Sequence, residues 1–319
     1  MITRRDSLKL ALAAGTSLAW PLAGAGKAEA EAGDTAALIT RAIPSSGQRL
    51  PVVGLGSSAT FAQSAGQDDL AALRAVFEAL VEHGGAVFDT APSYGDAEAV
   101  AGRIVQELGI AKSLFWATKL NVAGRGGGQA DVAAARRQLE ASFERLGQPV
   151  IDLIQVHNLG DVATQLPLLR GLKDAGRIRY LGLTTTFERQ YEALEQWMRR
   201  EPLDFIGVDY AIDNRAVEER LLPLARDRGI AVLCYAPFGR TRLWSRVRGQ
   251  ALPAWAADVG ARSWAQFFLK FVIANPTITA ATPATSQARH MIDNMGAAFG
   301  ELPDDAMRRR MVEYVRTLS

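Results

Sequence analysis

Short apolar segments alternate along the chain with longer segments whose apolar residues recur at helical spacing. The short runs are apolar along their whole length, as strands of a parallel sheet are when both faces are buried. Eight strands are expected, at Val52–Leu55, Ala86–Phe88, Leu114–Ala117, Leu153–Val156, Ile178–Leu183, Phe205–Val208, Ile230–Cys234 and Ile278–Ala281. The spacing predicts helices over Leu70–Glu82, Ala97–Leu108, Val132–Leu146, Val162–Lys173, Glu188–Arg199, Ala216–Arg226, Ser263–Ile273 and Ser286–Met295.

Eight alternations of strand and helix within about 250 residues predict an α/β fold, a closed (β/α)8 TIM barrel. The competing architecture is an open doubly wound sheet, which normally carries a GxGxxG motif after its first strand. The segment Gly54-Leu55-Gly56 lacks the third glycine and the acidic partner downstream. Before it, Leu38–Leu50 contains the turn-forming sequence Pro44-Ser45-Ser46-Gly47 and predicts a β-hairpin. In a barrel, this N-terminal hairpin would close the bottom.

The N-terminal thirty residues have the order of a secretory signal peptide. Arg4 and Arg5 precede an Ala/Leu-rich run from Leu10 to Leu22, and the paired arginines resemble a twin-arginine export motif. The run is shorter than the ~20 residues that a membrane-spanning helix needs, and Gly15 and Pro21 interrupt it. A cleaved signal peptide is therefore favoured over an N-terminal membrane anchor.

Two domains are expected, a twin-arginine signal peptide at residues 1–30 and a barrel at residues 31–319. Cleavage is expected after Ala30, with Ala25 as the alternative site. The twin-arginine translocation machinery is then a partner, the mature protein is periplasmic, and it keeps no stable membrane anchor. Cys234 is the only cysteine, so no intrachain disulfide can form in an oxidising compartment.

The charge balance bears on possible partners of the mature chain. The whole sequence has 36 basic and 34 acidic residues. Residues 1–30 contain four of the basic residues and two of the acidic ones, so the remainder has equal numbers of both. A neutral chain without a basic stripe has little electrostatic attraction for a nucleic acid backbone, and nucleic acid binding is not expected.

Polar residues follow three successive predicted strands. Asp89 and Tyr94 lie in Phe88-Asp89-Thr90-Ala91-Pro92-Ser93-Tyr94-Gly95, Lys119 ends the third strand, and His157 ends the fourth. Each alone has a structural explanation, as a capping carboxylate, a core tyrosine, a lysine with a buried stem or a buried histidine. In a barrel, however, the carboxyl ends of the strands converge on one face, where the active sites of this fold lie. Together the four residues therefore predict a catalytic site.

Asp89, Tyr94, Lys119 and His157 resemble the catalytic tetrad of the aldo-keto reductases, and the resemblance extends from about Ile39 to Met295. It implies an NAD(P)H-dependent oxidoreductase that interconverts a carbonyl compound (an aldehyde, ketone or sugar) and an alcohol, with Tyr94 as proton donor. A nearby ammonium favours ionisation of a phenol, which is the role implied for Lys119. Asp89 would keep Lys119 charged and placed, and His157 would hydrogen-bond the carbonyl oxygen.

The resemblance also implies a nicotinamide cofactor, because no residue of the chain can supply a hydride. NADP(H) is expected, with NAD(H) as the alternative. The corresponding cofactor-binding positions are Gly56, Thr184, Thr185, Tyr235, Arg289, Asp293 and Asn294. Tyr235 would stack on the nicotinamide, while Asp293 and Asn294 would hold the adenine. The chain departs from the family at Thr184-Thr185, where a Ser-Asn pair is usual, and at Gly207, where a Gln is usual.

Two other functions compete with carbonyl reduction. One is a non-catalytic NADP-binding accessory or sensor protein, which the altered residues at Thr184, Thr185 and Gly207 make conceivable. The other is a Schiff-base aldolase, because a lysine that ends a barrel strand can attack a carbonyl carbon. The sequence does not identify the substrate or the physiological direction of the reaction.

Overall fold

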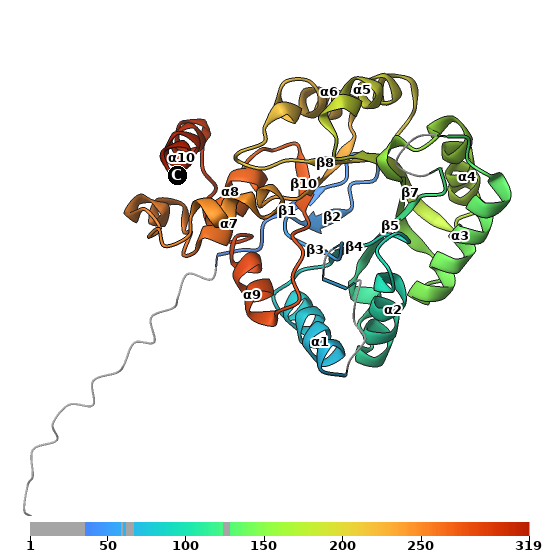
Figure 1. Cartoon of the computed structure of the whole chain (residues 1–319), viewed down its shortest axis with the longest axis horizontal. Coiled ribbons are helices and arrows are strands. Elements are labelled where there is room, and N and C mark those ends of the chain that lie inside the picture. Colours follow the sequence, from blue (N-terminus) through green and yellow to red (C-terminus); the bar gives the residue numbers. More distant parts are fainter. Residues whose placement is uncertain (1–35, 59, 62–66, 124–127, 319) are drawn as a thin grey trace, which may run out of the picture. The chain divides into compact units, whose positions relative to one another are not determined.

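The computed structural model describes residues 36–58, 60–61, 67–123 and 128–318 (Figure 1). The predicted signal peptide, residues 1–30, lies outside the described residues. Eight parallel strands form the central sheet, with neighbours in the order β10-β9-β8-β7-β6-β5-β4-β3. The strands are β3 (Leu55–Gly56), β4 (Val87–Asp89), β5 (Phe115–Leu120), β6 (Ile151–Val156), β7 (Ile178–Thr185), β8 (Phe205–Asp209), β9 (Ala231–Tyr235) and β10 (Ile278–Ala281).

The sheet closes on itself between its first and last strands. Two isolated parallel bridges, Val53 with Ala281 and Gly56 with Ala284, join the β3 segment to the β10 segment. The predicted (β/α)8 barrel is thereby confirmed. Closure of the sheet leaves neither of these two strands as a free edge.

The first barrel strand lies further along the chain than its apolar run predicts. The pattern placed it at Val52–Leu55, whereas β3 comprises Leu55–Gly56. The predicted segment still pairs within the barrel, because Val52 and Gly54 hydrogen-bond with Ala281 of β10, at 2.9 and 2.8 Å, and Val53 forms a parallel bridge with the same residue. A Cβ at Gly54 would lie 2.6 Å from the Val87 carbonyl oxygen, so a larger residue does not fit at this seam.

Helices surround the barrel strands and cover their outward faces (Figure 1). This ring consists of α1 (Gln67–Glu82), α2 (Ala97–Leu108), α3 (Val132–Leu146), α4 (Val162–Asp174), α5 (Tyr191–Arg200), α6 (Leu221–Arg228), α8 (Trp264–Ile273) and α9 (Ala288–Gly296). The other helical segments are η1 (Ala111–Ser113), η2 (His157–Leu159), η3 (Glu188–Gln190), η4 (Ala216–Glu218), η5 (Gly239–Thr241), α7 (Arg242–Arg246), η6 (Ala254–Val259) and α10 (Asp305–Thr317). Within the described part of the chain, no helix combines the length and the apolar character needed to cross a membrane.

Local sequence signals explain where several helices begin and end. The side chains of Asp131 and Ser263 accept hydrogen bonds from backbone N–H groups in the first turns of α3 and α8. Such N-caps satisfy donors that have no partner within the helix. Gly109, Gly147 and Gly229 end α2, α3 and α6 in the left-handed conformation, which glycine adopts without a steric penalty.

The N-terminal hairpin closes the bottom of the barrel, as predicted. Its strands β1 (Thr40–Ala42) and β2 (Arg49–Pro51) pair in antiparallel register. Ile43 and Leu50 belong to the same buried cluster as the inward-facing side chains of the barrel strands. The hydroxyl group of Tyr180, on β7, donates a hydrogen bond of 2.8 Å to Gln48. Apolar burial and this polar contact together attach the hairpin to the barrel.

A buried lysine holds the segment that leads from α9 into the C-terminal helix α10. The side chain of Lys270, on α8, is 0% exposed. Its Nζ atom donates to the carbonyl oxygens of Phe299 and Glu301, at 2.7 and 2.9 Å. Burial lowers the pKa of Lys270 to about 8, although the nearby Glu301 acts in the opposite direction. Both hydrogen bonds survive deprotonation because a neutral amine still has two donors.

We expect Lys270 to give the stability of the protein a characteristic pH dependence. Its pKa in the folded chain is about 8, below the ordinary 10.5 of an unfolded chain, so the unfolded chain binds more protons between these values. The free energy of unfolding should therefore rise as pH increases through this range. At a pH above 10.5, where the amine is neutral in both the folded and the unfolded chain, Lys270→Met should lower it by about 2 kcal/mol, because two buried carbonyl groups lose their donor.

Thermal denaturation of both proteins across this pH range measures the effect. The Lys270→Met variant should lose the alkaline rise, whereas Lys112→Met, at an exposed position on η1, should keep it. Identical pH dependence in the wild type and Lys270→Met would contradict the assignment.

Candidate active site

The uppermost layer of the barrel interior is polar, and we call Asp89, Lys119, Gln155, Gly207 and Tyr235 the polar layer. Lys119 of β5 and Gln155 of β6 are direct partners in the parallel register. The residues two positions earlier on all five strands belong to the apolar interior cluster, namely Val87, Ala117, Leu153, Phe205 and Leu233. Because strand residues two apart face the same side, the polar layer lies directly above this apolar cluster.

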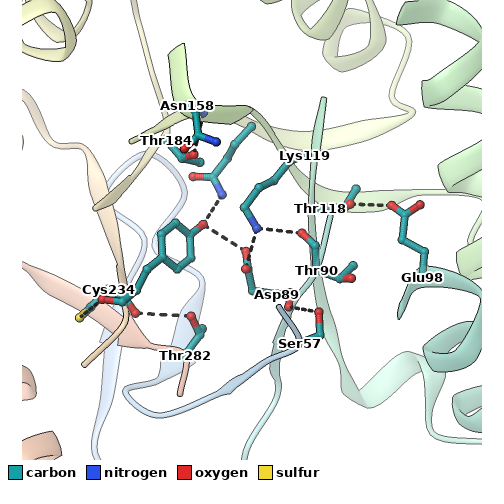
Figure 2. Close-up of polar contacts among 12 residues, drawn as sticks. Ser57, Asp89, Thr90, Glu98, Thr118, Lys119, Asn158, Thr184, Cys234 and Thr282 are labelled. Atoms are coloured by element: carbon teal, nitrogen blue, oxygen red, sulfur yellow. Dashed lines mark hydrogen bonds and ion pairs between the residues drawn. The ribbon is translucent and has the colours of Figure 1, made fainter. Parts of the chain in front are cut away.

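A buried ion pair occupies the centre of the polar layer. The Lys119 Nζ atom lies 2.7 Å from Oδ2 of Asp89 and donates a second hydrogen bond, of 2.8 Å, to the Thr90 carbonyl oxygen (Figure 2). The two side chains are only 1% and 5% exposed. A buried ammonium is tolerated only when it is paired and hydrogen-bonded, and both conditions hold here.

The surroundings of the pair keep Lys119 protonated. Burial alone lowers the pKa of Lys119, but the charge of Asp89 and the phenol of Tyr94 outweigh it and raise the pKa above its ordinary value. Burial raises the pKa of Asp89, while Lys119 and the Tyr235 hydroxyl act against that rise. Both oxygens of Asp89 accept a hydrogen bond, from Lys119 and from Tyr235, as an ionised carboxylate does.

Tyr94 and His157 complete the predicted tetrad. Tyr94 lies in the turn between β4 and α2, and the centroid of its ring is 5.1 Å from Lys119 Nζ. The rings of Tyr94 and His157 meet edge to face, with centroids 5.9 Å apart. His157 begins η2, where the left-handed conformations of Asn158 and Leu159 turn the chain sharply after β6. The structure therefore brings together all four residues that the sequence singled out.

Tyr235, expected from the resemblance to stack on the nicotinamide, makes two hydrogen bonds in the same site that the sequence did not predict. Its hydroxyl accepts a hydrogen bond of 2.8 Å from Nε2 of Gln155 and donates one of 3.1 Å to Oδ1 of Asp89. Its ring centroid lies 5.0 Å from Lys119 Nζ. Gln155 was missed altogether, although it lies on β6 only two residues before His157.

A second buried carboxylate supports the site from outside the barrel. Glu98, on α2, is 1% exposed and accepts a hydrogen bond of 2.7 Å from the hydroxyl of Thr118 (Figure 2). Thr118 precedes Lys119 on β5, so this bond joins α2 to the strand that carries the lysine. Sequence analysis did not identify Glu98 because the contact depends on the packing of α2. Within the described ranges, no group of three or more His, Cys, Asp or Glu side chains could hold a metal ion.

Three of the proposed cofactor positions lie near the top of the barrel. Gly56 lies at the seam, where an added Cβ would be 2.6 Å from the Thr282 carbonyl oxygen. The Thr184 hydroxyl accepts a hydrogen bond from the Asn158 N–H at 3.3 Å. Thr185 accepts one from the Phe187 N–H and donates one to Gln190. Both threonine hydroxyls are therefore already engaged with the protein.

Besides Tyr235, the remaining three positions lie on α9. Arg289 is exposed, and its Nε atom donates to Gln287 at 2.9 Å. The Asp293 carboxylate accepts a hydrogen bond of 2.8 Å from Gln266 of α8. Asn294 is 3% exposed. Of these three residues, Arg289 therefore offers the most accessible polar group.

Comparison with known proteins agrees with this geometry. The model of the Aldo/keto reductase family matches residues 52–311. The aldo-keto reductase str7 of Strobilurus tenacellus is 26% identical over 274 residues, which cover 75% of this chain and 80% of that protein. An NADH-specific methylglyoxal reductase of Escherichia coli is 27% identical over 190 residues, covering 53% of this chain and 57% of that protein.

A solved structure shows the same fold. The aldo/keto reductase of Klebsiella pneumoniae in complex with NADP and acetate superposes with a TM-score of 0.71 and 22% identity, covering 84% of this chain and 93% of that chain. The family match spans most of the sequence and includes every strand of the barrel. The chain therefore belongs to the aldo/keto reductase family of NAD(P)-dependent oxidoreductases.

Proposed function

We propose that this protein interconverts the carbonyl group of an aldehyde, ketone or sugar and the corresponding alcohol, with Tyr94 as the proton donor in the direction of reduction. The observation that carries this proposal is the buried Lys119–Asp89 pair, at 2.7 Å, with the Tyr94 ring beside the ammonium. His157 lies edge-on to Tyr94, so two groups able to hydrogen-bond one carbonyl oxygen lie side by side.

The residues present fit a nicotinamide dinucleotide as the hydride source. Oε1 of Gln155 is buried and has no hydrogen-bond partner among the described residues, so the polar layer retains capacity for a polar group of a ligand. Arg289 on α9 supplies an exposed cation for a phosphate. The Klebsiella neighbour was solved with NADP and the Escherichia coli relative is named NADH-specific, so NADP(H) is our first choice and NAD(H) the second.

The chain's own residues account for the proton transfer. The Tyr94 hydroxyl donates its proton to the carbonyl oxygen as negative charge develops there. The Lys119 ammonium, kept charged by Asp89, stabilises the phenolate that remains. His157 hydrogen-bonds the same oxygen and so orients the substrate. When bound, the nicotinamide supplies the hydride that completes the reduction.

The protonation of Lys119 argues against the Schiff-base aldolase. Attack on a carbonyl carbon requires a neutral amine. The pKa of Lys119 is raised, and its Nζ atom is engaged by both Asp89 and Thr90. A non-catalytic accessory protein also has less support, because the substitutions at Thr184, Thr185 and Gly207 leave all four tetrad residues in place.

We expect Tyr94→Phe to abolish most carbonyl reduction while preserving cofactor binding. The variant keeps the ring beside His157 but lacks the proton donor, so kcat should fall at least about 100-fold. Nicotinamide absorbance measures turnover with a panel of aldehydes, ketones and sugars, and fluorescence quenching measures cofactor affinity. The matched control is Tyr191→Phe, which removes a hydroxyl that donates a hydrogen bond of 3.5 Å to the carbonyl oxygen of Asp209. Wild-type turnover in Tyr94→Phe would refute its role as proton donor.

The ion pair should show strong energetic coupling between its two members. Asp89→Asn and Lys119→Met should each lower the free energy of unfolding by about 3 kcal/mol, because each leaves one buried charge without its partner. The double variant should lose clearly less than the sum of the single losses, since it contains no unpaired charge. Urea denaturation of the four proteins measures this coupling. Additive losses would show that the two side chains do not depend on each other.

We also propose that the protein is exported by the twin-arginine pathway and is periplasmic after cleavage behind Ala30. Support comes from the paired Arg4 and Arg5 and from the short apolar run that follows them. Neither feature lies among the described residues.

Replacing both Arg4 and Arg5 with lysine should therefore block export, because the change preserves charge but removes the arginine pair. Cell fractionation and N-terminal sequencing should find uncleaved precursor inside the cell, whereas the wild type should begin at Glu31 in the periplasm. Lys27→Arg, outside the pair, serves as the control. Mature periplasmic protein from the double-lysine variant would instead indicate the general secretion route.

A further inference from the structure

We propose that Tyr235 is a positioning residue of the tetrad: its hydroxyl, held by Gln155, fixes the Asp89 carboxylate that pairs with Lys119, in space that Gly207 leaves open. This inference rests on the proposed function, because it assigns Tyr235 a part in the same proton chemistry. It adds to the stacking role that the family resemblance implies for Tyr235. Stacking needs only the ring, whereas positioning needs the hydroxyl.

The direction of the hydrogen bonds gives Tyr235 its role. Nε2 of Gln155 can only donate, so the Tyr235 oxygen accepts from it at 2.8 Å. The single proton of the hydroxyl then points to Oδ1 of Asp89, at 3.1 Å. If the Gln155 amide were turned around, Tyr235 would donate its proton to Gln155. The Tyr235 oxygen and Oδ1 of Asp89 would then face each other at 3.1 Å with no proton between them. Gln155 therefore fixes the direction in which Tyr235 donates.

Asp89 thereby has one donor for each carboxylate oxygen. Oδ2 receives Lys119 and Oδ1 receives Tyr235, and the side chain is only 5% exposed. The titratable groups around this site are Lys119 from β5, Tyr94 from the turn after β4 and Tyr235 from β9, with His157 beyond Tyr94. Burial, Asp89 and Tyr94 all raise the pKa of Tyr235 well above its ordinary value, so it remains a donor at neutral pH.

The glycine at position 207 is what admits the Tyr235 ring. A Cβ at Gly207 would lie 2.3 Å from Cε2 of Tyr235 and 2.7 Å from its hydroxyl oxygen. Any other residue would therefore push the ring out of the polar layer. Gly207 stands on β8 where the family resemblance led us to expect Gln, so the space that a Gln side chain would occupy is left for the ring of Tyr235, which reaches in from β9.

The decisive variant is Tyr235→Phe, which keeps the ring and removes only the hydroxyl. In cofactor-free protein, infrared titration of the protonated carboxyl band follows Asp89, and the band is assigned by its loss in Asp89→Asn. Without the Tyr235 donor, the pKa of Asp89 should rise relative to the wild type, because that donor stabilises the ionised form. This measurement does not depend on turnover.

Kinetics provide the second measurement. In Tyr235→Phe, kcat should fall about tenfold and its acidic limb should shift to higher pH, because Asp89 then becomes protonated more easily. Cofactor affinity should stay within about twofold of the wild type, since the ring remains. The matched control is Tyr180→Phe, which removes a barrel tyrosine hydroxyl that bonds Ser46 and Gln48 at the opposite end. It should leave both the titration and the pH profile unchanged.

Gly207→Ala tests the spatial argument independently. In the wild-type background it should reproduce the effects of Tyr235→Phe on Asp89, because the new methyl group displaces the ring. In a Tyr235→Ala background, where the space is vacant, it should have no further effect.

The outcomes separate the two proposals. If Tyr235→Phe matches the wild type in the Asp89 titration and in kcat, while Tyr235→Ala loses cofactor affinity, Tyr235 only stacks and the positioning role is wrong. If the wild-type protein turns over no carbonyl compound, the proposed function fails. The infrared titration would still establish or overturn the contact between Tyr235 and Asp89.

Discussion

The buried pair of Lys119 and Asp89 is the interaction on which the rest of the site depends. An ammonium placed in a barrel interior carries a desolvation penalty that only close partners can offset. Asp89 and the Thr90 carbonyl supply those partners on the neighbouring strand. The stabilised charge then lies beside the Tyr94 ring, where it can act on a phenol. The partners that make burial of Lys119 possible thus also place its charge where it can assist proton donation by Tyr94 in the proposed reaction.

Barrel closure is what extends this pair into a larger network. In the order of the sheet, β9 and β4 are separated by β10 and β3, and only the seam between those two brings them round to each other. Tyr235 on β9 reaches Asp89 on β4 across the barrel interior. An open sheet with the same strand order would leave the two residues at opposite ends. The contact therefore depends on the fold as a whole, more than on any local motif.

Much of this architecture was predictable, because each strand and helix of the barrel has its own hydrophobic period. The tetrad was predictable too, since three of its members follow directly from strand ends that a barrel must gather. The first strand was predicted at Val52–Leu55 and β3 comprises Leu55–Gly56, whereas the pairing of Val52 and Gly54 with β10 is a long-range contact that no local pattern reveals. Helix α10 was not expected, although Met307, Met311 and Val315 recur at helical spacing. The contact between Tyr235 and Asp89 was missed because it depends on the space that the lack of a side chain at Gly207 leaves for the tyrosine ring.

The polar layer also explains how the site can be ready before any ligand binds. Asp89 has a donor on each oxygen and Lys119 has two acceptors, all from the protein itself. The free energy needed to orient these charges is thus spent during folding and is not required again in each catalytic cycle. Oε1 of Gln155 remains as a buried acceptor with no partner among the described residues. A ligand that donates to it would add a hydrogen bond without breaking those that hold Lys119 and Asp89 in place.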